Sequence, residues 1–284
     1  MLRPTWTWPL PVDGRAADAL AGELGVPVPV AELLVRRGFE TTARARAFLD
    51  PSLDQLHDPF LMRDMETAVA RVESALASGE KIVVYGDYDV DGITATALLV
   101  RYLRWRGATV EYYIPHRVED GYGLSLDGVS ALVERGARLI ITCDCAVTAV
   151  AEILAARHAG LDVIVTDHHE PGPAIPAAVA VLDPKREDCG YPDRNLAAVG
   201  VAFKLCEALE ISAGRSRDTL RRGLDLVGAI AGESGVPSSA IGANSPSFTH
   251  SWRACAPTSK SWRASAARSS SARWRCRSCC WWGP

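Results

Sequence analysis

The sequence lacks any hydrophobic run long enough to cross a membrane. Its first residues include Trp6, Trp8 and several prolines, and they lack the basic-then-apolar pattern of a secretory signal. The eight cysteines are scattered without the paired spacing of a zinc or iron–sulfur site. These absences predict a cytoplasmic protein that has no membrane partner and keeps its cysteines as buried, reduced thiols.

Two common nucleotide-binding motifs are also missing. The chain has no glycine-rich dinucleotide fingerprint of the form GxGxxG after a predicted strand, and no GxxxxGK[ST] phosphate loop. Dehydrogenases and nucleoside triphosphatases normally need these loops to hold a pyrophosphate. The sequence therefore argues against both classes.

Acidic residues disappear abruptly near the end of the chain. None of the 34 Asp and Glu residues lies after Glu233, whereas seven of the 31 Lys and Arg residues do. The first 233 residues thus carry 24 basic and 34 acidic side chains, although the net charge of the whole chain is only −3. The composition indicates an acidic body followed by a basic tail.

The body shows two patterns of secondary structure. Residues 1–74 have helical apolar spacing at 17–24, 30–37, 42–49 and 64–76, which predicts a helical N-terminal cap. From residue 75, short β-branched strands at 82–85, 110–114, 139–142, 163–166 and 178–182 alternate with helical stretches at 93–105, 126–135, 147–157 and 196–209. This alternation predicts an α/β domain over 75–227, with a doubly wound and mostly parallel sheet.

Three carboxylates directly follow the first of these strands. Asp87, Asp89 and Asp91 occupy every second position, so in an extended segment their side chains would point the same way. Such a cluster repels itself unless a cation neutralises it. The helix that we expect to begin near Ile93 would also offer free N–H groups to a phosphate. The alternative is an acidic surface turn after a core strand.

Acidic residues follow three further strands, namely Asp144, Asp167 and Asp183, and His168 and His169 come directly after Asp167. One Asp after a strand usually caps the next helix. In a parallel sheet, however, the carboxyl ends of the strands share one edge, where ligands bind. The four strand ends together therefore predict a metal site.

Carboxylates with one or two imidazoles are typical ligands of Mn²⁺, with Mg²⁺ as the other candidate. The number of carboxylates is sufficient for two ions that share a bridging Asp, an arrangement that hydrolyses phosphate esters with a water. Adjacent side chains on a loop cannot easily point the same way. We therefore expect one of the two histidines to bind metal and the other to face the phosphate.

Several motifs resemble a known family. Residues 86–92 (GDYDVDG) and 167–169 (DHH) are similar to the DHH phosphoesterase superfamily. Within it, residues 48–51 (FLDP), 58–65 (DPFLMRDM), 117–124 (RVEDGYGL) and 195–204 (NLAAVGVAFK) resemble the RecJ family of bacterial exonucleases specific for single-stranded DNA. The likeness covers about residues 30 to 227.

The resemblance implies Mn²⁺- or Mg²⁺-dependent 5′→3′ hydrolysis of single-stranded DNA to mononucleotides during repair and recombination. The partners it implies are single-stranded DNA and proteins such as a single-strand-binding protein or a helicase. By position, the implied metal ligands are Asp89, Asp91, Asp144 as the bridge, and His168, with Asp87 beside them. The implied catalytic residues are Asp144 and His169, with His169 on the scissile phosphate. Arg117 and Tyr122 match positions that touch DNA, and we expect Asp183 to hold its loop.

The chain departs from this family after Val227. A Gly-x-x-Ala-Asp segment, whose Asp completes the second metal's ligands in the family, is replaced by residues 228–235 (GAIAGESG), in which Glu233 is a doubtful substitute. The tail at 228–284 is rich in Ser, Arg, Trp and Cys without periodicity, as expected of a GC-rich gene read in the wrong frame. A disordered basic arm that stacks tryptophans on bases is the rival interpretation. With a frameshift, we expect a fragment with impaired exonuclease activity.

Two other functions stay open. One is a DHH phosphoesterase for short oligonucleotides, cyclic dinucleotides or pyrophosphate, against which the N-terminal helices and residues 117–124 argue. The other is a metal-poor scaffold that binds replication proteins. Stoichiometric Mn²⁺ binding that depends on Asp89 would argue against the scaffold.

Overall fold

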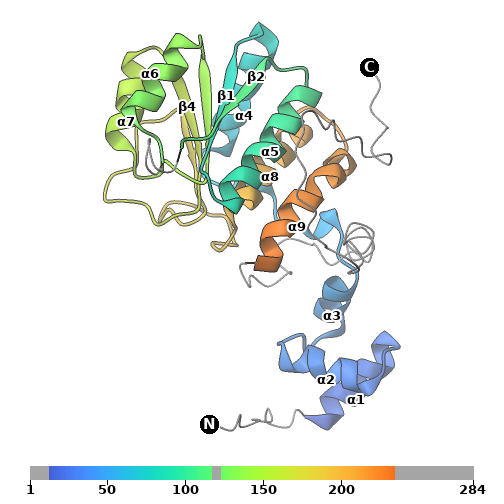
Figure 1. Ribbon diagram of the computed structural model, residues 1–284. Coiled ribbons are helices and arrows are strands. Elements are labelled where there is room, and N and C mark those ends of the chain that lie inside the picture. Colours follow the sequence, from blue (N-terminus) through green and yellow to red (C-terminus); the bar gives the residue numbers. More distant parts are fainter. Residues whose placement is uncertain (1–12, 117–122, 234–284) are drawn as a thin grey trace, which may run out of the picture.

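The structure is a computed structural model that describes residues 13–116 and 123–233, with side chains described as far as residue 230. Its centre is a five-stranded sheet with helices on both faces, and a smaller group of helices precedes it (Figure 1). Arg117, Tyr122 and the tail from residue 234 lie outside the described residues. The predicted fold class, an α/β domain after a helical N-terminal segment, is confirmed.

The strands form a sheet in the order β2-β1-β3-β4-β5, and every neighbouring pair is parallel. Their bounds are β1 (Ile82–Gly86), β2 (Val110–Tyr113), β3 (Leu139–Cys143), β4 (Asp162–Thr166) and β5 (Ala180–Leu182). All residues of β1 and β3 are buried, which explains why these strands read as continuous apolar runs rather than as alternating patterns.

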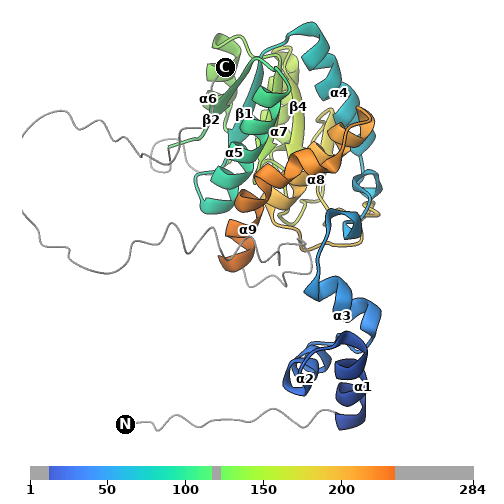
Figure 2. The same ribbon diagram turned by 90° about the vertical axis from the view of Figure 1, so that its right-hand side faces the viewer.

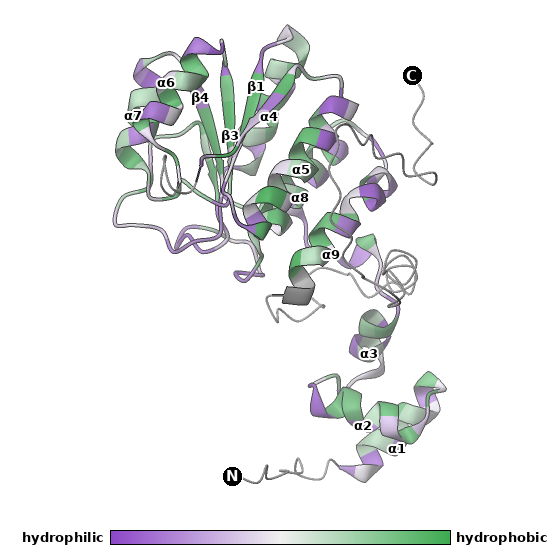
Figure 3. Ribbon diagram, in the orientation of Figure 1, coloured by the Kyte–Doolittle hydropathy of each residue, from purple (hydrophilic) through white to green (hydrophobic). Residues whose placement is uncertain are grey.

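Each face of the sheet has its own core. On one face, side chains such as Val84 and Ile141 pack under α4 (Met65–Ser78), α5 (Val90–Trp105) and α8 (Ala198–Ser212). On the other, Val83 and Ile140 pack under α6 (Leu126–Glu134) and α7 (Val150–His158). Figure 3 shows the apolar strands between these two helical layers. This is the doubly wound arrangement that the alternation of strands and helices predicts.

Helix α8 is buried along almost its whole length, including its charged residues. Lys204 pairs with Glu207 at 2.6 Å and donates to the carbonyl of His57 at 2.8 Å. Glu210 accepts from the hydroxyl of Tyr102 at 2.7 Å. Because these buried charges are all paired, α8 can sit in the core with polar side chains.

The N-terminal segment contains three short helices with a small core of their own. They are α1 (Gly14–Leu24), α2 (Val28–Arg36) and α3 (Thr42–Leu49), packed around Leu20, Ala31 and Leu34. Figures 1 and 2 both place them at the end of the molecule farthest from the sheet. Two single-turn helices, η1 (Leu53–Gln55) and η2 (Pro59–Leu61), connect them to α4.

The motif at residues 58–65 fastens this connection to the edge of the sheet. Asp64 lies in the left-handed region at φ 66° and accepts from the backbone N–H of Val181 in β5 at 3.2 Å. The same oxygen accepts from Arg186 at 2.7 Å. Asp64 thereby occupies a hydrogen-bonding position that the edge strand would otherwise leave open.

After α8 the chain continues through η3 (Arg217–Gly223) into α9 (Leu224–Glu233). Helix α9 crosses the predicted boundary at residue 228, and the rest of the predicted tail lies beyond the described residues. The division into a cap, a DHH domain and an aberrant tail stays a prediction. None of the described helices is both long enough and apolar enough to cross a membrane.

Candidate metal centre

The predicted site residues lie where the chain changes direction within the sheet. From β1 the chain crosses to β2 on one side, whereas β3, β4 and β5 follow on the other side. In open α/β sheets, ligands bind beyond the carboxyl ends of the strands at such a point. Asp87 follows β1 and Asp144 follows β3, so both lie at this point.

Backbone hydrogen bonds continue past the strand ends and hold these acidic residues level with one another. The N–H of Asp87 donates to Cys143 at 3.2 Å, that of Asp144 to Thr166 at 3.0 Å, and that of Asp167 to Leu182 at 3.0 Å. Asp144 itself adopts a left-handed backbone at φ 64°. The three carboxylates therefore follow three neighbouring strands at the same level, along the carboxyl edge of the sheet.

The expected extended run from Asp87 to Asp91 is wrong, because α5 begins at Val90 and not near Ile93. Asp89 is the N-cap of this helix, and its carboxylate accepts from the N–H of Gly92 at 2.9 Å. The sequence led us to expect N–H groups free to bind a phosphate at this helix start. The N–H of Gly92 is not free, because it is bonded to Asp89. Asp87, Asp89 and Asp91 lie respectively in a loop, at a cap and in a helical turn.

Asp91 connects the centre to the buried helix α8. One of its oxygens accepts from the N–H of Ala198 at 2.8 Å and the other from that of Val199 at 2.9 Å. The helix N-terminus is a favourable place for a negative charge. Burial nevertheless raises the pKa of Asp91, and these two hydrogen bonds oppose the rise.

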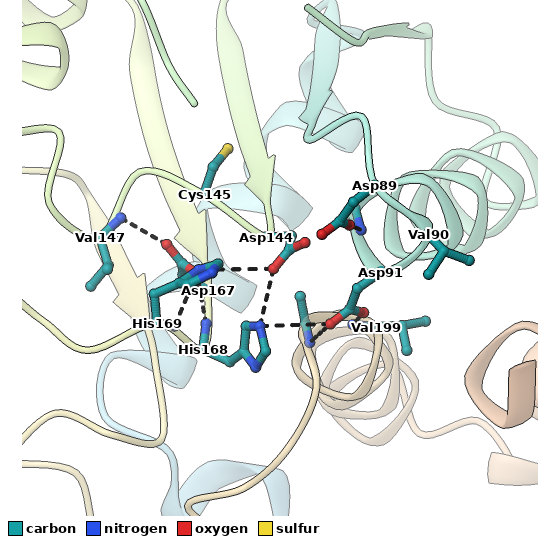
Figure 4. A network of polar contacts seen from close by, with 12 residues as sticks. Asp89, Val90, Asp91, Asp144, Cys145, Val147, Asp167, His168, His169 and Val199 are labelled. Carbon is teal, nitrogen blue, oxygen red and sulfur yellow. Dashed lines mark hydrogen bonds and ion pairs between the residues drawn. The ribbon is translucent and has the colours of Figure 1, made fainter. Parts of the chain in front are cut away.

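The two histidines approach Asp144 from the loop that follows β4. Nε2 of His168 lies 3.1 Å from Oδ1 of Asp144 and 3.7 Å from Oδ2 of Asp91. Nδ1 of His169 lies 3.9 Å from the same Asp144 oxygen. In Figure 4, Asp144 stands between the histidines on one side and the Asp89–Asp91 turn on the other.

Asp167 fixes the orientation of His169. Its buried carboxylate accepts from Nδ1 of His169 at 2.7 Å and from the N–H of Val147 at 2.9 Å. Burial alone would raise the pKa of Asp167, but these hydrogen bonds lower it. In return, the hydrogen bond to Asp167 raises the pKa of His169 to about 9. At neutral pH, His169 is therefore a cation with its Nε2–H directed away from Asp167.

Two sets of potential ligands share Asp144. Oxygen and nitrogen atoms of Asp144, His168 and His169 lie within 4.8 Å of one another, and so do oxygens of Asp87, Asp89 and Asp144. Burial, together with the charges of Asp91 and Asp89, raises the pKa of Asp144 to about 7. Burial also raises the pKa of Asp87, whose Oδ1 accepts no hydrogen bond within the described parts of the chain.

The chemistry of these groups fits a hard divalent cation. Three carboxylates within contact distance need a positive charge, and oxygen ligands with imidazole suit Mn²⁺ or Mg²⁺. The buried Asp87 oxygen without a partner is a further acceptor that such an ion would satisfy. Two groups of potential ligands that share one carboxylate could hold such a cation.

The structure brings together all of the predicted metal and catalytic residues that it describes, namely Asp87, Asp89, Asp91, Asp144, His168 and His169. Their individual roles stay predictions. Asp183 is buried and accepts from the N–H of Lys185 at 2.7 Å, so it holds its loop as expected. Asp167 is outside the predicted set, although its place at a strand end directly before two histidines was a usable signal.

Comparison with known proteins gives one family and several relatives. A model of the DHH family, N-terminal domain, matches residues 81–229. The chain is 45% identical over 197 residues to the single-stranded-DNA-specific exonuclease RecJ of Bacillus subtilis, a match that covers 69% of this chain and 25% of that protein. The chain thus spans about a quarter of the length of this curated relative.

Two solved structures of RecJ from Thermus thermophilus have a similar fold. The one in complex with Mn²⁺ has a TM-score of 0.64 at 32% identity, and the match covers 78% of this chain and 31% of that one. The one in complex with Mg²⁺ has a TM-score of 0.53 at 27% identity, with coverage of 81% and 28%. Both contain the type of ion that the acidic and histidine cluster of this chain fits.

Proposed function

Because the chain belongs to the DHH family, we propose that it is a metal-dependent phosphodiesterase that shortens single-stranded DNA from its 5′ end. The observation that carries the proposal is the carboxylate of Asp144, which belongs to two sets of ligands at once. The single-stranded-DNA specificity named for the Bacillus subtilis relative supports the choice of substrate.

The residues that would hold the ions divide around Asp144. One set contains His168, whose Nε2 lies 3.1 Å from Oδ1 of Asp144 and 3.7 Å from Oδ2 of Asp91. The other set joins Asp87 and Asp89 to Asp144. Divalent ions held there would neutralise the phosphate and supply a water of lowered pKa as the nucleophile.

His169 contributes a positive charge that the chain itself positions. Its ring is fixed by the 2.7 Å hydrogen bond to Asp167, while about half of its side chain stays exposed. A protonated imidazole beside the scissile phosphate stabilises the oxygens on which negative charge develops. The hydrogen bond to Asp167 raises the pKa of His169 to about 9, which favours this charge at neutral pH.

The cellular setting belongs to the same proposal. We place the reaction in DNA repair and recombination in the cytoplasm, where a single-strand-binding protein or a helicase would present the strand. The support is the specificity in the relative's name and the acidic body, which needs help from cations to hold a polyanion.

The test compares hydrolysis of three substrates in Mn²⁺: a 5′-phosphorylated single strand, the duplex of the same sequence, and a dinucleotide. We expect mononucleotides from the single strand, none from the duplex, and loss of activity in Asp144→Asn. Asp183→Asn is the matched control, because Asp183 also follows a strand of the sheet but belongs to neither set of ligands. Preference for the dinucleotide would instead assign a phosphoesterase of small substrates.

A further inference from the structure

Lys185 lies on the loop after the edge strand β5, at the same carboxyl edge of the sheet as the metal centre. The loops after β4 and β5 run together along the lower edge of the sheet in Figure 1. The backbone of Lys185 is held from both sides: its N–H donates to Asp183 at 2.7 Å, and its carbonyl accepts from Arg194 at 2.5 Å. Only its side chain is left to move.

The ammonium group of Lys185 has a weak partner. Its Nζ lies 3.6 Å from Oε1 of Glu170, which directly follows His169. The side chain of Glu170 is 82% exposed, whereas that of Lys185 is 26% exposed. A pair this open to solvent contributes little and is screened by salt, so another anion can replace Glu170.

The positive charge of Lys185 acts on two groups at this edge of the sheet, namely His169 and Asp183. Its positive charge opposes the rise in the pKa of His169 that the hydrogen bond to Asp167 causes. It also opposes the rise in the pKa of Asp183, to about 6, that burial causes. The charge of Lys185 therefore acts on the histidine that we place at the scissile phosphate.

We propose that the ammonium of Lys185 exchanges Glu170 for a phosphate of the bound single strand, next to the phosphate at His169. Lys185 is then a substrate-binding residue at the β5 side of the centre. This inference rests on the proposed function and names a part of its binding surface. Glu170 acts as a placeholder that keeps the ammonium beside the centre until the strand arrives.

Lys81 offers a matched control within the same chain. Its side chain is 25% exposed, much as that of Lys185 is, although its ammonium is held more firmly, by Glu111 at 2.7 Å and the carbonyl of Arg135 at 2.8 Å. It precedes β1, however, and so lies at the amino ends of the strands, on the opposite edge of the sheet. Lys81→Gln removes the same charge without touching the proposed binding surface.

The experiment measures binding of an oligothymidylate with hydrolysis-resistant phosphorothioate linkages to the full chain in Mn²⁺, by fluorescence anisotropy. We expect Lys185→Gln to weaken binding about tenfold and to reduce the slope of log K against log salt by about 0.7, as for one lost phosphate contact. Lys185→Arg should restore most of the affinity, and Lys81→Gln should change it less than twofold. Equal losses with 5′-phosphorylated and 5′-hydroxyl strands assign a backbone phosphate, whereas a loss confined to the former assigns the terminal one.

A second variant tests the exchange itself. Glu170→Gln removes the competing anion, so it should tighten binding severalfold in the wild-type background and not in the Lys185→Gln background. Lys185→Gln that binds like wild type, or a wild-type chain that does not bind the strand, overturns the inference. Hydrolysis of an unmodified strand is followed in parallel. Absence of hydrolysis by the wild-type chain refutes the proposed function, whereas the binding measurements on Lys185→Gln test the inference about Lys185.

Discussion

The carboxylate of Asp91 accepts a hydrogen bond from the backbone N–H of Val199 at 2.9 Å, across 108 residues of sequence. Its other oxygen accepts from Ala198, so one side chain of the metal centre also caps the buried helix α8. In the proposed site, metal binding and the packing of the core would therefore be coupled through a single residue.

Asp91→Asn should lower the stability of the metal-free protein more than Asp89→Asn does. Both variants remove one charge from the same cluster. Asn retains the single oxygen that the N-cap Asp89 needs, but at position 91 it replaces one of the two oxygens that accept from Ala198 and Val199 with an NH2 donor. The expected difference is about 1–3 kcal/mol. Urea unfolding in EDTA measures it, and equal stabilities would show that the cap on α8 contributes nothing.

The strands and helices were largely predictable, whereas the route of the chain through the acidic turn was not. The β-branched runs at β1 and β3 are buried on both faces, and such runs identify central parallel strands without further information. The prediction of an extended turn after β1 was wrong because an Asp at position 89 suits an N-cap as well as it suits the predicted metal site. Its bond to Gly92 starts the helix three residues early.

The convergence of the site was predictable from one rule, that the carboxyl ends of parallel strands share an edge. The sequence could not show the order of the strands, which places Asp144 next to the loop of Asp87. Nor could the sequence show which hydrogen bonds each carboxylate makes. Asp167 is the example, because its importance lies in its hydrogen bonds with the ring of His169 and the N–H of Val147.

Mn²⁺ affinity should rise with pH between about 6 and 8. The pKa of Asp144 is raised to about 7, chiefly by burial, and hydrogen bonding to Asp144 raises the pKa of His168 although burial opposes it. Protons therefore compete with the ion for the same atoms below these values, and each one released contributes about tenfold in affinity per pH unit. Titration calorimetry at pH 6, 7 and 8 tests this, and an affinity independent of pH would contradict it.

Asp167→Asn should return the pKa of His169 from about 9 toward its ordinary value of about 6.5, because the main cause of the rise is the hydrogen bond to Asp167. Titration of the His169 ring by NMR measures the shift. Glu170→Gln is the control, since it removes a neighbouring exposed charge without a bond to the ring. Equal shifts in the two variants would mean that general charge, and not Asp167, sets this pKa.

The same Asp167→Asn variant should lose about 1–3 kcal/mol of stability at pH 7. The pKa of Asp167 is lowered in the folded state, since hydrogen bonds outweigh its burial. Its contribution is thus present above about pH 4 and is lost as the pH falls through the lowered value. Unfolding curves at pH 7 and in acid should show the gap between wild type and variant narrowing; a constant gap would exclude this cause.

Gly92→Ala should destabilise the protein by about 1–3 kcal/mol or more, because a Cβ there would lie 2.7 Å from the carbonyl oxygen of Asp87. All of the nearest atoms are backbone atoms of Asp87, which leave little room for adjustment. Gly172→Ala is the control, since its Cβ would meet nothing closer than 3.8 Å. Similar thermal unfolding of both variants would show that the turn after β1 is looser than the structure indicates.

The central claim is that Asp144 is a ligand shared between two halves of one metal centre, and anomalous diffraction at the manganese edge tests it most directly. Crystals grown with Mn²⁺ should show an anomalous peak in contact with both Asp144 and His168, and crystals of Asp144→Asn should lose every peak at the carboxyl edge of the sheet. Manganese bound elsewhere, or a peak that persists in Asp144→Asn, would contradict the account.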